Sequence, residues 1–254
     1  MPSDKPPLLQ VEHLTSIMED KLVLDDVSFE VAAGEIFGVM GLSGAGKSTL
    51  LRNIMGLIKP VSGRIIVNGV DITTLDETRM NEVRLRMGMS FQYSALFDSM
   101  TVFDNVAFGL RRRRVPKQEV SQKVSHYLDV VGMSGTEHLM PHNLSGGMRK
   151  RVGIARALST EPDIVLYDEP TSGLDPVLAA VVDDLIRKLR DQFGVSSIVV
   201  THDVQHLFSY ADRVLMLYEA KAIEIGTPEQ LRRSDDPVLK QFVVGSHQGP
   251  IRVD

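Results

Sequence analysis

The stretch Gly41-Leu42-Ser43-Gly44-Ala45-Gly46-Lys47-Ser48 decides the fold of this 254-residue chain. It follows the short apolar run Ile36–Met40, which is typical of a buried parallel strand, and a helix is predicted over residues 47–57. The pattern G-x-x-x-x-G-K-[ST] between a strand and a helix lets backbone N–H groups wrap phosphate oxygens. A glycine-rich turn without a ligand is the alternative, and the flanking elements argue against it. We therefore expect an α/β protein with a phosphate-binding loop.

Within this loop, Lys47 is expected to neutralise the β- and γ-phosphate charge, and the Ser48 hydroxyl to bind Mg²⁺. The residues expected to contact the nucleotide are Gly41, Ser43, Gly44, Ala45, Gly46, Lys47, Ser48 and Thr49.

The composition is that of an ordinary globular protein, with 43% hydrophobic and 24% charged residues. A net charge of −5 argues against a dedicated nucleic-acid binder. No apolar run approaches the roughly 18 to 20 residues that span a bilayer, and residues 1–7 lack a hydrophobic signal core. Zero cysteines agree with a reducing compartment. We expect a cytoplasmic protein.

One domain over residues 1–254 is predicted, because no linker and no internal repeat divides the chain. Its α/β core covers residues 8–92 and 160–226 and includes a β subdomain. Residues 93–159 form an inserted helical subdomain, since apolar residues there recur at helical spacing without a convincing strand, and residues 227–254 form a tail. Strands are predicted at residues 8–14, 22–31, 36–40, 64–67, 87–91, 164–167, 197–201, 214–218 and 222–225. Further helices are predicted at residues 77–86, 120–131, 148–158, 176–190, 228–233 and 238–243.

A second phosphate-binding surface is predicted at Leu144-Ser145-Gly146-Gly147-Met148. A hydroxyl, exposed N–H groups and the positive end of the following helix converge there on one point. Taken alone, Ser-Gly-Gly is also a common turn at the start of a helix. Two phosphate-recognising segments about a hundred residues apart suggest a nucleotide held between two copies of the protein.

Two adjacent carboxylates, Asp168 and Glu169, follow the apolar run at residues 164–167. Because successive strand side chains alternate between faces, we expect the two to point in different directions. Asp168 is expected to hold Mg²⁺, and Glu169 to orient and deprotonate the attacking water. An ordinary solvated strand end is the alternative for two isolated acids.

Two further polar residues follow predicted strands. His202 comes after residues 197–201, where its imidazole can reach a γ-phosphate, although most single histidines are structural or exposed. Gln92 comes after residues 87–91, where its side chain can touch Mg²⁺ or water and its backbone can move the helical insert. His138 and His142 have a metal-ligand spacing, but Pro141 breaks the helix that this spacing needs.

Together these segments resemble, over nearly the whole chain, an ATP-binding-cassette (ABC) transporter ATPase. In that family they correspond to Walker A, the Q-loop, the signature, Walker B with its catalytic Glu, the D-loop ending in Asp175, and the H-loop. The resemblance implies a P-loop NTPase with a RecA-like core, an antiparallel β subdomain and an α-helical subdomain. It also implies that ATP and Mg²⁺ lie between two copies, in contact with Asp175, Ser145, Gly146 and Gly147. Glu169, His202 and Gln92 are then the catalytic residues, with Ser48, Gln92 and Asp168 around the metal.

The chain departs from the family pattern at two places. Position 148 is Met where the signature usually ends in Gln, and this leaves the anion-facing hydroxyl and amides intact. The adenine-stacking aromatic, expected around Ile17 or Met18, is absent, so adenine is expected to rest on an aliphatic or thioether surface.

The subfamily is indicated by Met148 with residues 92–97, 102–107, 139–141 and 144–151. These are similar to the ATPases that work with MCE proteins, including the Mla phospholipid transporter type, the toluene-tolerance homologue and a chloroplast lipid importer. The tail at residues 235–250 is similar to the Mla tail too, whereas residues 171–175 have the general ABC form rather than the Phe-Val-Gly-Gln-Asp of several Mla ATPases.

The resemblance implies a homodimer on the cytoplasmic face of the inner membrane, together with a permease, an MCE substrate-binding protein and a small regulatory subunit. Phe97, Met100 and Phe103 either receive a permease helix or pack internally. The arginines at residues 111–114 either face acidic groups or form a solvated surface. The alternatives for function are an ABC ATPase for amino acids, ions or lipoproteins, and a soluble ABC ATPase without a transport role.

Overall fold

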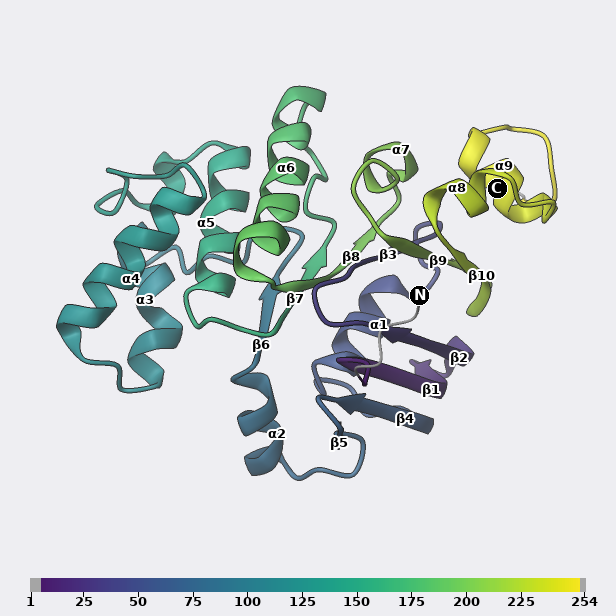
Figure 1. Ribbon diagram of the computed structural model, residues 1–254, viewed down its shortest axis with the longest axis horizontal. Coiled ribbons are helices and arrows are strands. Elements are labelled where there is room, and N and C mark those ends of the chain that lie inside the picture. Colours follow the sequence, from purple (N-terminus) through teal and green to yellow (C-terminus); the bar gives the residue numbers. More distant parts are fainter. Residues whose placement is uncertain (1–5, 252–254) are drawn as a thin grey trace. The chain divides into compact units, whose positions relative to one another are not determined.

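The computed structural model describes residues 6–251 and divides into two compact units (Figure 1). The first unit comprises the described parts of residues 1–83 and 196–254, and the second comprises residues 84–195. In the described part of the chain, no helix is long and apolar enough to cross a membrane.

An antiparallel sheet in the first unit has the strand order β2-β1-β4-β5. Its strands are β1 (Leu9–Met18), β2 (Lys21–Val31), β4 (Ser62–Val67) and β5 (Val70–Asp71). The turn between β1 and β2 consists of Glu19 and Asp20, whose φ values of 48° and 62° suit the tight turns that join antiparallel strands. Just before this turn Ile17 pairs with Leu22. This sheet is the predicted β subdomain.

A second set of strands in the same unit contains β3 (Ile36–Met40), β8 (Ser196–Thr201), β9 (Arg213–Tyr218) and β10 (Lys221–Gly226). β3 is parallel to both β8 and β9, and β10 is antiparallel to β9. Every residue of β3 is buried, as its continuous apolar run predicts. Phe29 of β2 stacks on Phe37 of β3 with ring centroids 5.0 Å apart, so one apolar core supports both sets of strands.

Short helices complete the first unit: α1 (Lys47–Ile54), α7 (Val204–Leu207), α8 (Pro228–Arg232) and α9 (Pro237–Val244). The sequence predicts that α1 continues to Leu57, but it ends at Ile54 and the chain turns at Gly56, whose φ is 64°. A Cβ on Gly56 would lie 2.8 Å from the sulfur of Met80, in α2 (Glu77–Arg84). The close approach of Met80 therefore explains why a glycine ends this helix.

The second unit pairs two parallel strands, β6 (Met87–Ser90) and β7 (Ile164–Asp168), with Ser90 opposite Tyr167. Its helices are α3 (Val102–Arg112), α4 (Lys117–Val130), the 3₁₀ helix η1 (Pro141–Asn143), α5 (Gly146–Leu158) and α6 (Pro176–Phe193). The structure describes all residues between Gln92 and Ser145, and no strand occurs among them. In Figure 1, α3, α4 and α5 lie together, and each has buried apolar residues, among them Val106, Val124 and Ile154.

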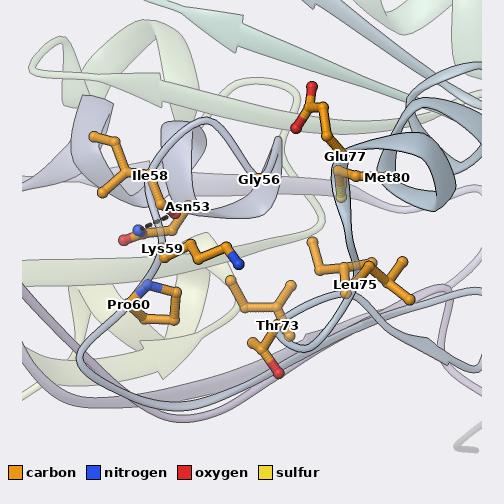
Figure 2. Close-up of a pocket in the computed structure, with 11 residues that line it drawn as sticks. Asn53, Gly56, Ile58, Lys59, Pro60, Thr73, Leu75, Glu77 and Met80 are labelled. Carbon is orange, nitrogen blue, oxygen red and sulfur yellow. Dashed lines mark hydrogen bonds between the residues drawn. The ribbon is translucent and has the colours of Figure 1, made fainter.

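A small pocket of 160 Å³ lies at the end of α1, lined by residues such as Ile58, Thr73 and Met80 (Figure 2). The Asn53 side chain donates to the Ile58 carbonyl at 2.9 Å, while its own oxygen has no hydrogen-bond partner among the described residues. A polar atom beside a space of this size suits an ordered water. None of the predicted site residues lines the pocket, so it is not part of the candidate site.

Candidate functional site

The phosphate loop joins β3 to α1 in the first unit. Gly46 is the N-cap of α1 with φ 100°, a conformation that favours glycine, and no side chain caps this helix. A Cβ on Gly46 would lie 2.6 Å from the Val23 carbonyl oxygen. Gly46 has no side chain that could cap the N–H groups at the start of α1, and a glycine-rich helix start of this kind is suited to phosphate binding.

Lys47 is buried, with 7% of its surface exposed, and its side chain turns back onto the loop. Its Nζ donates to the carbonyl oxygens of Gly41 at 2.8 Å and Leu42 at 3.0 Å. Ser43 and Gly44, at the crest of the loop, are exposed, and Ser48 and Thr49 follow in α1. A cationic side chain is therefore held against the loop that the sequence predicts to bind phosphate.

His202 lies at the end of the strand next to this loop. β8 pairs with β3 so that Thr201 is opposite Met40, and the residues that follow each strand are His202 and Gly41. Since paired parallel strands end at the same edge of a sheet, the exposed His202 and the phosphate loop share that edge.

A hollow of 510 Å³ adjoins the phosphate loop in the same unit, lined by Leu22, Ser43, Ala45 and Tyr218 among others. Leu22 and its cross-strand neighbour Ile17 are 45% and 46% exposed, although both are apolar. Tyr218 was not predicted from the sequence. Its aromatic ring comes from the end of β9, far along the chain, and no local pattern connects that strand with the loop.

In the second unit, β7 ends at Asp168 and delivers both predicted carboxylates. Asp168 and Glu169 are each 8% exposed. The explanation offered by the sequence, alternation along a strand, does not extend to Glu169, because its φ is 48° and the strand has already ended. A non-glycine residue in the left-handed region costs roughly 1–2 kcal/mol and is often found at functional sites.

Lys150 connects the backbone at Glu169 with the backbone at Gln92. Its Nζ donates to the Gln92 carbonyl at 2.5 Å and to the Glu169 carbonyl at 2.9 Å. Burial lowers the pKa of Lys150, and the nearby charges of Glu169 and Asp168 partly oppose this shift. Lys150 was missed from the sequence. Its spacing from Gly147 and Ile154, on the buried face of α5, is the signal that could have found it.

A second cation of α5 holds the segment that follows Gln92. The Arg156 guanidinium donates to the carbonyls of Ser94 at 2.8 Å and Ala95 at 2.6 Å, and it lies over the ring of Phe97. Ser94 and Ala95 have φ values of 61° and 43°. Burial lowers the pKa of Arg156. This turn is therefore fixed by a side chain more than fifty residues away in the sequence.

The predicted second phosphate surface begins α5. The sequence places the helix start at Met148, whereas α5 already begins at Gly146, with Ser145 as its N-cap. The Ser145 hydroxyl accepts a hydrogen bond from the Met148 N–H at 3.3 Å. Ser145 and Gly146 are exposed. The part of this helix start that faces solvent is thus the hydroxyl-bearing Ser145 and the first helical residue, Gly146.

Asp175 is the N-cap of α6, and Pro176 is the first helical residue, as the sequence predicts. One oxygen of Asp175 accepts from both the Val177 and the Leu178 N–H at 3.0 Å. The carboxylate therefore stabilises the helix start through that oxygen.

The donors proposed for Mg²⁺ are a hydroxyl, an amide and a carboxylate, in Ser48, Gln92 and Asp168. Oxygen ligands of this kind suit Mg²⁺, which commonly takes one or two carboxylates together with substrate phosphates. No group of three or more His, Cys, Asp or Glu side chains that could hold a metal occurs within residues 6–251. Pro141–Asn143 is a 3₁₀ helix, so His138 and His142 do not lie one turn apart on an α-helix.

Phe97, which was predicted either to receive a permease helix or to pack internally, is only partly buried. Phe97 packs against Phe108 with ring centroids 4.8 Å apart, yet it is 41% exposed, and Tyr93 is 86% exposed.

The arginine run at residues 111–114 is not simply a solvated surface. Arg111 pairs with Asp104 at 2.8 Å, and the Arg113 guanidinium donates to the Thr160 carbonyl at 2.7 Å and to the Leu85 carbonyl. At least two of the four arginines thus stabilise the fold itself.

Comparison with known proteins shows the family to which the chain is similar. The ABC transporter family model matches residues 24–172. The chain is 42% identical to the intermembrane phospholipid transport system ATP-binding protein MlaF of Haemophilus influenzae, over 96% of this chain and 93% of that protein. It is 43% identical to the methionine import ATP-binding protein MetN 2 of Rhodococcus jostii, over 93% of this chain and 71% of that protein. The post-hydrolysis dimer of the cassette MJ0796 bound to ADP and phosphate aligns with a TM-score of 0.80 and 28% identity, over 87% of this chain and 98% of that one.

Proposed function

Because this chain belongs to the ABC transporter family and is the ATP-hydrolysing, ATP-binding subunit of such a transporter, we propose that two copies close around two ATP molecules to drive lipid transport. Closure brings the phosphate loop of each copy to the start of α5 in the other. The observation that supports this proposal is that each chain has two glycine-containing helix starts of different design, after Gly46 and after Ser145, and such helix starts favour anions.

Nucleotide binding begins at the phosphate loop. The amides that follow Gly46 receive phosphate oxygens, and Lys47 exchanges its two carbonyl partners for the β- and γ-phosphates. The hollow at Leu22 and Tyr218 receives the nucleoside, and the exposed aliphatic pair Ile17 and Leu22 replaces the stacking aromatic of the family.

Hydrolysis depends on residues at the ends of β7 and β8. When bound, Mg²⁺ would be held by Ser48, Asp168 and Gln92, and it supplies charge neutralisation for the phosphates. Glu169 orients the attacking water and accepts its proton, while the His202 imidazole hydrogen-bonds the γ-phosphate. In the partner copy, the Ser145 hydroxyl and the amides of Gly146 and Gly147 bind the same γ-phosphate, so hydrolysis requires the dimer.

The membrane partner in this proposal is a permease whose helix docks at the exposed rings of Tyr93 and Phe97. The ATPase then lies on the cytoplasmic face of the inner membrane. The lipid assignment rests on Met148 with its neighbouring segments and on the similarity to the phospholipid transport ATPase. The similar identity to a methionine import ATPase supports a second candidate, a transporter of small solutes.

An experiment on the chain isolated from native membranes with its permease, and placed in vesicles, distinguishes lipid transport from transport of small solutes. ATP should move a labelled phospholipid but not labelled methionine, and Glu169→Gln should stop the movement. ATP-driven uptake of methionine without lipid movement would overturn the lipid assignment. An MCE protein in the isolated complex supports lipid transport, whereas a periplasmic solute-binding protein supports the second candidate.

A further inference from the structure

We infer that Lys150 is a positioning residue that links the anion site at the start of α5 to the catalytic carboxylate of the same chain. The inference rests on the proposed function, because it concerns how the two ATP sites of the dimer communicate. Lys150 does not contact the reacting atoms; it acts through the backbone of Glu169 and Gln92.

The geometry of the Lys150 ammonium group carries the inference. It is only 6% exposed, and its Nζ bonds two carbonyl oxygens from segments 77 residues apart, Gln92 and Glu169. Hydrogen bonds from a charged donor are roughly twice as strong as those between neutral groups. A buried ammonium group that lost these partners would be left uncompensated, so both carbonyls are held firmly against α5.

The Glu169 backbone is the part of the site that most needs such support. Its left-handed conformation, φ 48°, is strained for a residue with a side chain, and strain persists only where surrounding contacts fix it. The Glu169 carbonyl accepts from Lys150 at 2.9 Å and from the Ser172 N–H at 3.2 Å. The orientation of the carboxylate thus depends on the position of α5.

Lys150 lies in the second turn of α5, close to the residues that begin this helix. In the dimer, Ser145 and Gly146 serve the nucleotide of the partner copy, whereas Glu169 of the same chain serves its own nucleotide. A shift of α5 on engaging the partner's γ-phosphate therefore moves the Glu169 carbonyl directly. Lys150 couples the two sites, and turnover at one depends on occupancy of the other.

The test replaces Lys150 in the whole chain, purified with its permease. Lys150→Met keeps the length and apolar stem but removes the donors. Lys150→Gln keeps N–H donors on a shorter side chain. Lys188→Met, which removes an exposed lysine of α6, is the matched control. The readouts are kcat, KM for ATP and the Hill coefficient of hydrolysis, with the thermal midpoint of unfolding measured in parallel.

We expect kcat to fall by about 10- to 100-fold in Lys150→Met, with KM changed by less than about threefold. The Hill coefficient should fall toward 1. Lys150→Gln should give an intermediate kcat, and Lys188→Met should match the wild type. A merely structural role predicts a lower midpoint of unfolding with kcat per folded molecule and Hill coefficient unchanged.

A folded Lys150→Met or Lys150→Gln protein with wild-type kcat and Hill coefficient would overturn the inference, as would a rise in KM that accounts for the whole loss. If Lys150→Met fails to fold, Lys150→Gln decides by the same criteria. If the wild type fails to transport lipid, the lipid proposal is refuted, but the expected order of kcat values among the Lys150 variants does not change. Failure of the lipid proposal and failure of the inference about Lys150 are therefore distinguishable.

Discussion

The starts of α1 and α5 share one physical feature, the N–H groups that point out of the first turn of a helix, but they differ in how that turn is capped. At α1 the N-cap is Gly46, no side chain caps the helix, and the loop surrounds the site with Lys47 at its edge. At α5 the N-cap is Ser145, whose own hydroxyl already accepts from Met148, and the site is open to solvent. In the proposed mechanism the first binds phosphate by itself, whereas the second binds phosphate only when a second copy supplies the nucleotide.

In the proposed mechanism this difference lets one chain bind a nucleotide at α1 and respond at α5 to the nucleotide of a second copy. An uncapped helix start gains most from an anion, so it suits tight binding. A capped start gains less, which suits contacts that must form and break in each cycle. The comparison predicts that changes at α1 alter binding and that changes at α5 alter turnover.

Ser145→Arg gives the largest expected effect, because a long cationic side chain replaces the cap and fills the place of the phosphate. Hydrolysis should fall to background while ATP binding at the phosphate loop changes by less than about tenfold. Phosphate release and fluorescent-ATP titration measure the two quantities. Ser145→Thr, which retains the hydroxyl, is the control and should keep most activity. Lost binding in Ser145→Arg would show that the two helix starts are not separable.

Glu169→Gln should lower hydrolysis by about 10²- to 10⁴-fold, because the amide cannot accept the proton of the attacking water. Both helix starts should remain functional, so ATP binds and the closed dimer accumulates. Size-exclusion chromatography with ATP and Mg²⁺ detects the dimer, and adding excess chelator should return it to monomers. Normal turnover in this variant would exclude the role proposed for Glu169.

Gly46→Ala tests the α1 side of the comparison. The methyl group meets the Val23 carbonyl at 2.6 Å, and alanine is strained at φ 100°. A cost of about 1–3 kcal/mol corresponds to a rise of roughly 5- to 150-fold in the Kd for ATP, provided the loop distorts. Gly44→Ala, which has an equally unfavourable φ of 80° but nothing within 4 Å of the added methyl, separates backbone strain from collision. Equal effects would mean that contact with Val23 is unimportant.

Leu22→Ala should have the smallest effect, a rise of about two- to tenfold in the KM for ATP with kcat unchanged, since it removes part of the nucleoside surface. The same loss should appear with GTP, because an aliphatic surface does not distinguish bases by hydrogen bonds. Leu57→Ala, an exposed leucine outside the hollow, is the control. A change in kcat instead of KM would remove Leu22 from the nucleoside surface.

Most of the fold and the identity of the motifs could be predicted from the sequence because their signals are local. A strand, a glycine-rich loop and a helix follow one another at Ile36–Met40 and Lys47–Ile54, and Asp175-Pro176 marks a helix start by itself. The placement of these motifs in the ABC family is confirmed by the family model and the relatives. The roles of individual residues at the site stay predictions.

What escaped prediction depends on contacts between distant segments. Lys150 reaches backbone carbonyls of two other segments, Arg156 fixes the turn at Ser94, and Tyr218 reaches the phosphate loop from a late strand. The sequence alone does not distinguish a buried lysine or arginine from an exposed one. The sequence does not predict the left-handed backbone conformation of Glu169 either, because glutamate is not among the residues that commonly adopt it.

The backbone of Glu169 also has a consequence for any effort to improve this protein. Glycine adopts φ 48° without the penalty of roughly 1–2 kcal/mol, which exceeds the 0.5–1 kcal/mol that its greater freedom in the unfolded chain costs. Glu169→Gly is thus expected to be no less stable than the wild type, although it lacks the carboxylate that we propose as the general base. A screen that selects only for thermal stability or yield would therefore not reject the inactive Glu169→Gly variant. Such a screen needs an ATPase assay in addition to a measurement of thermal unfolding.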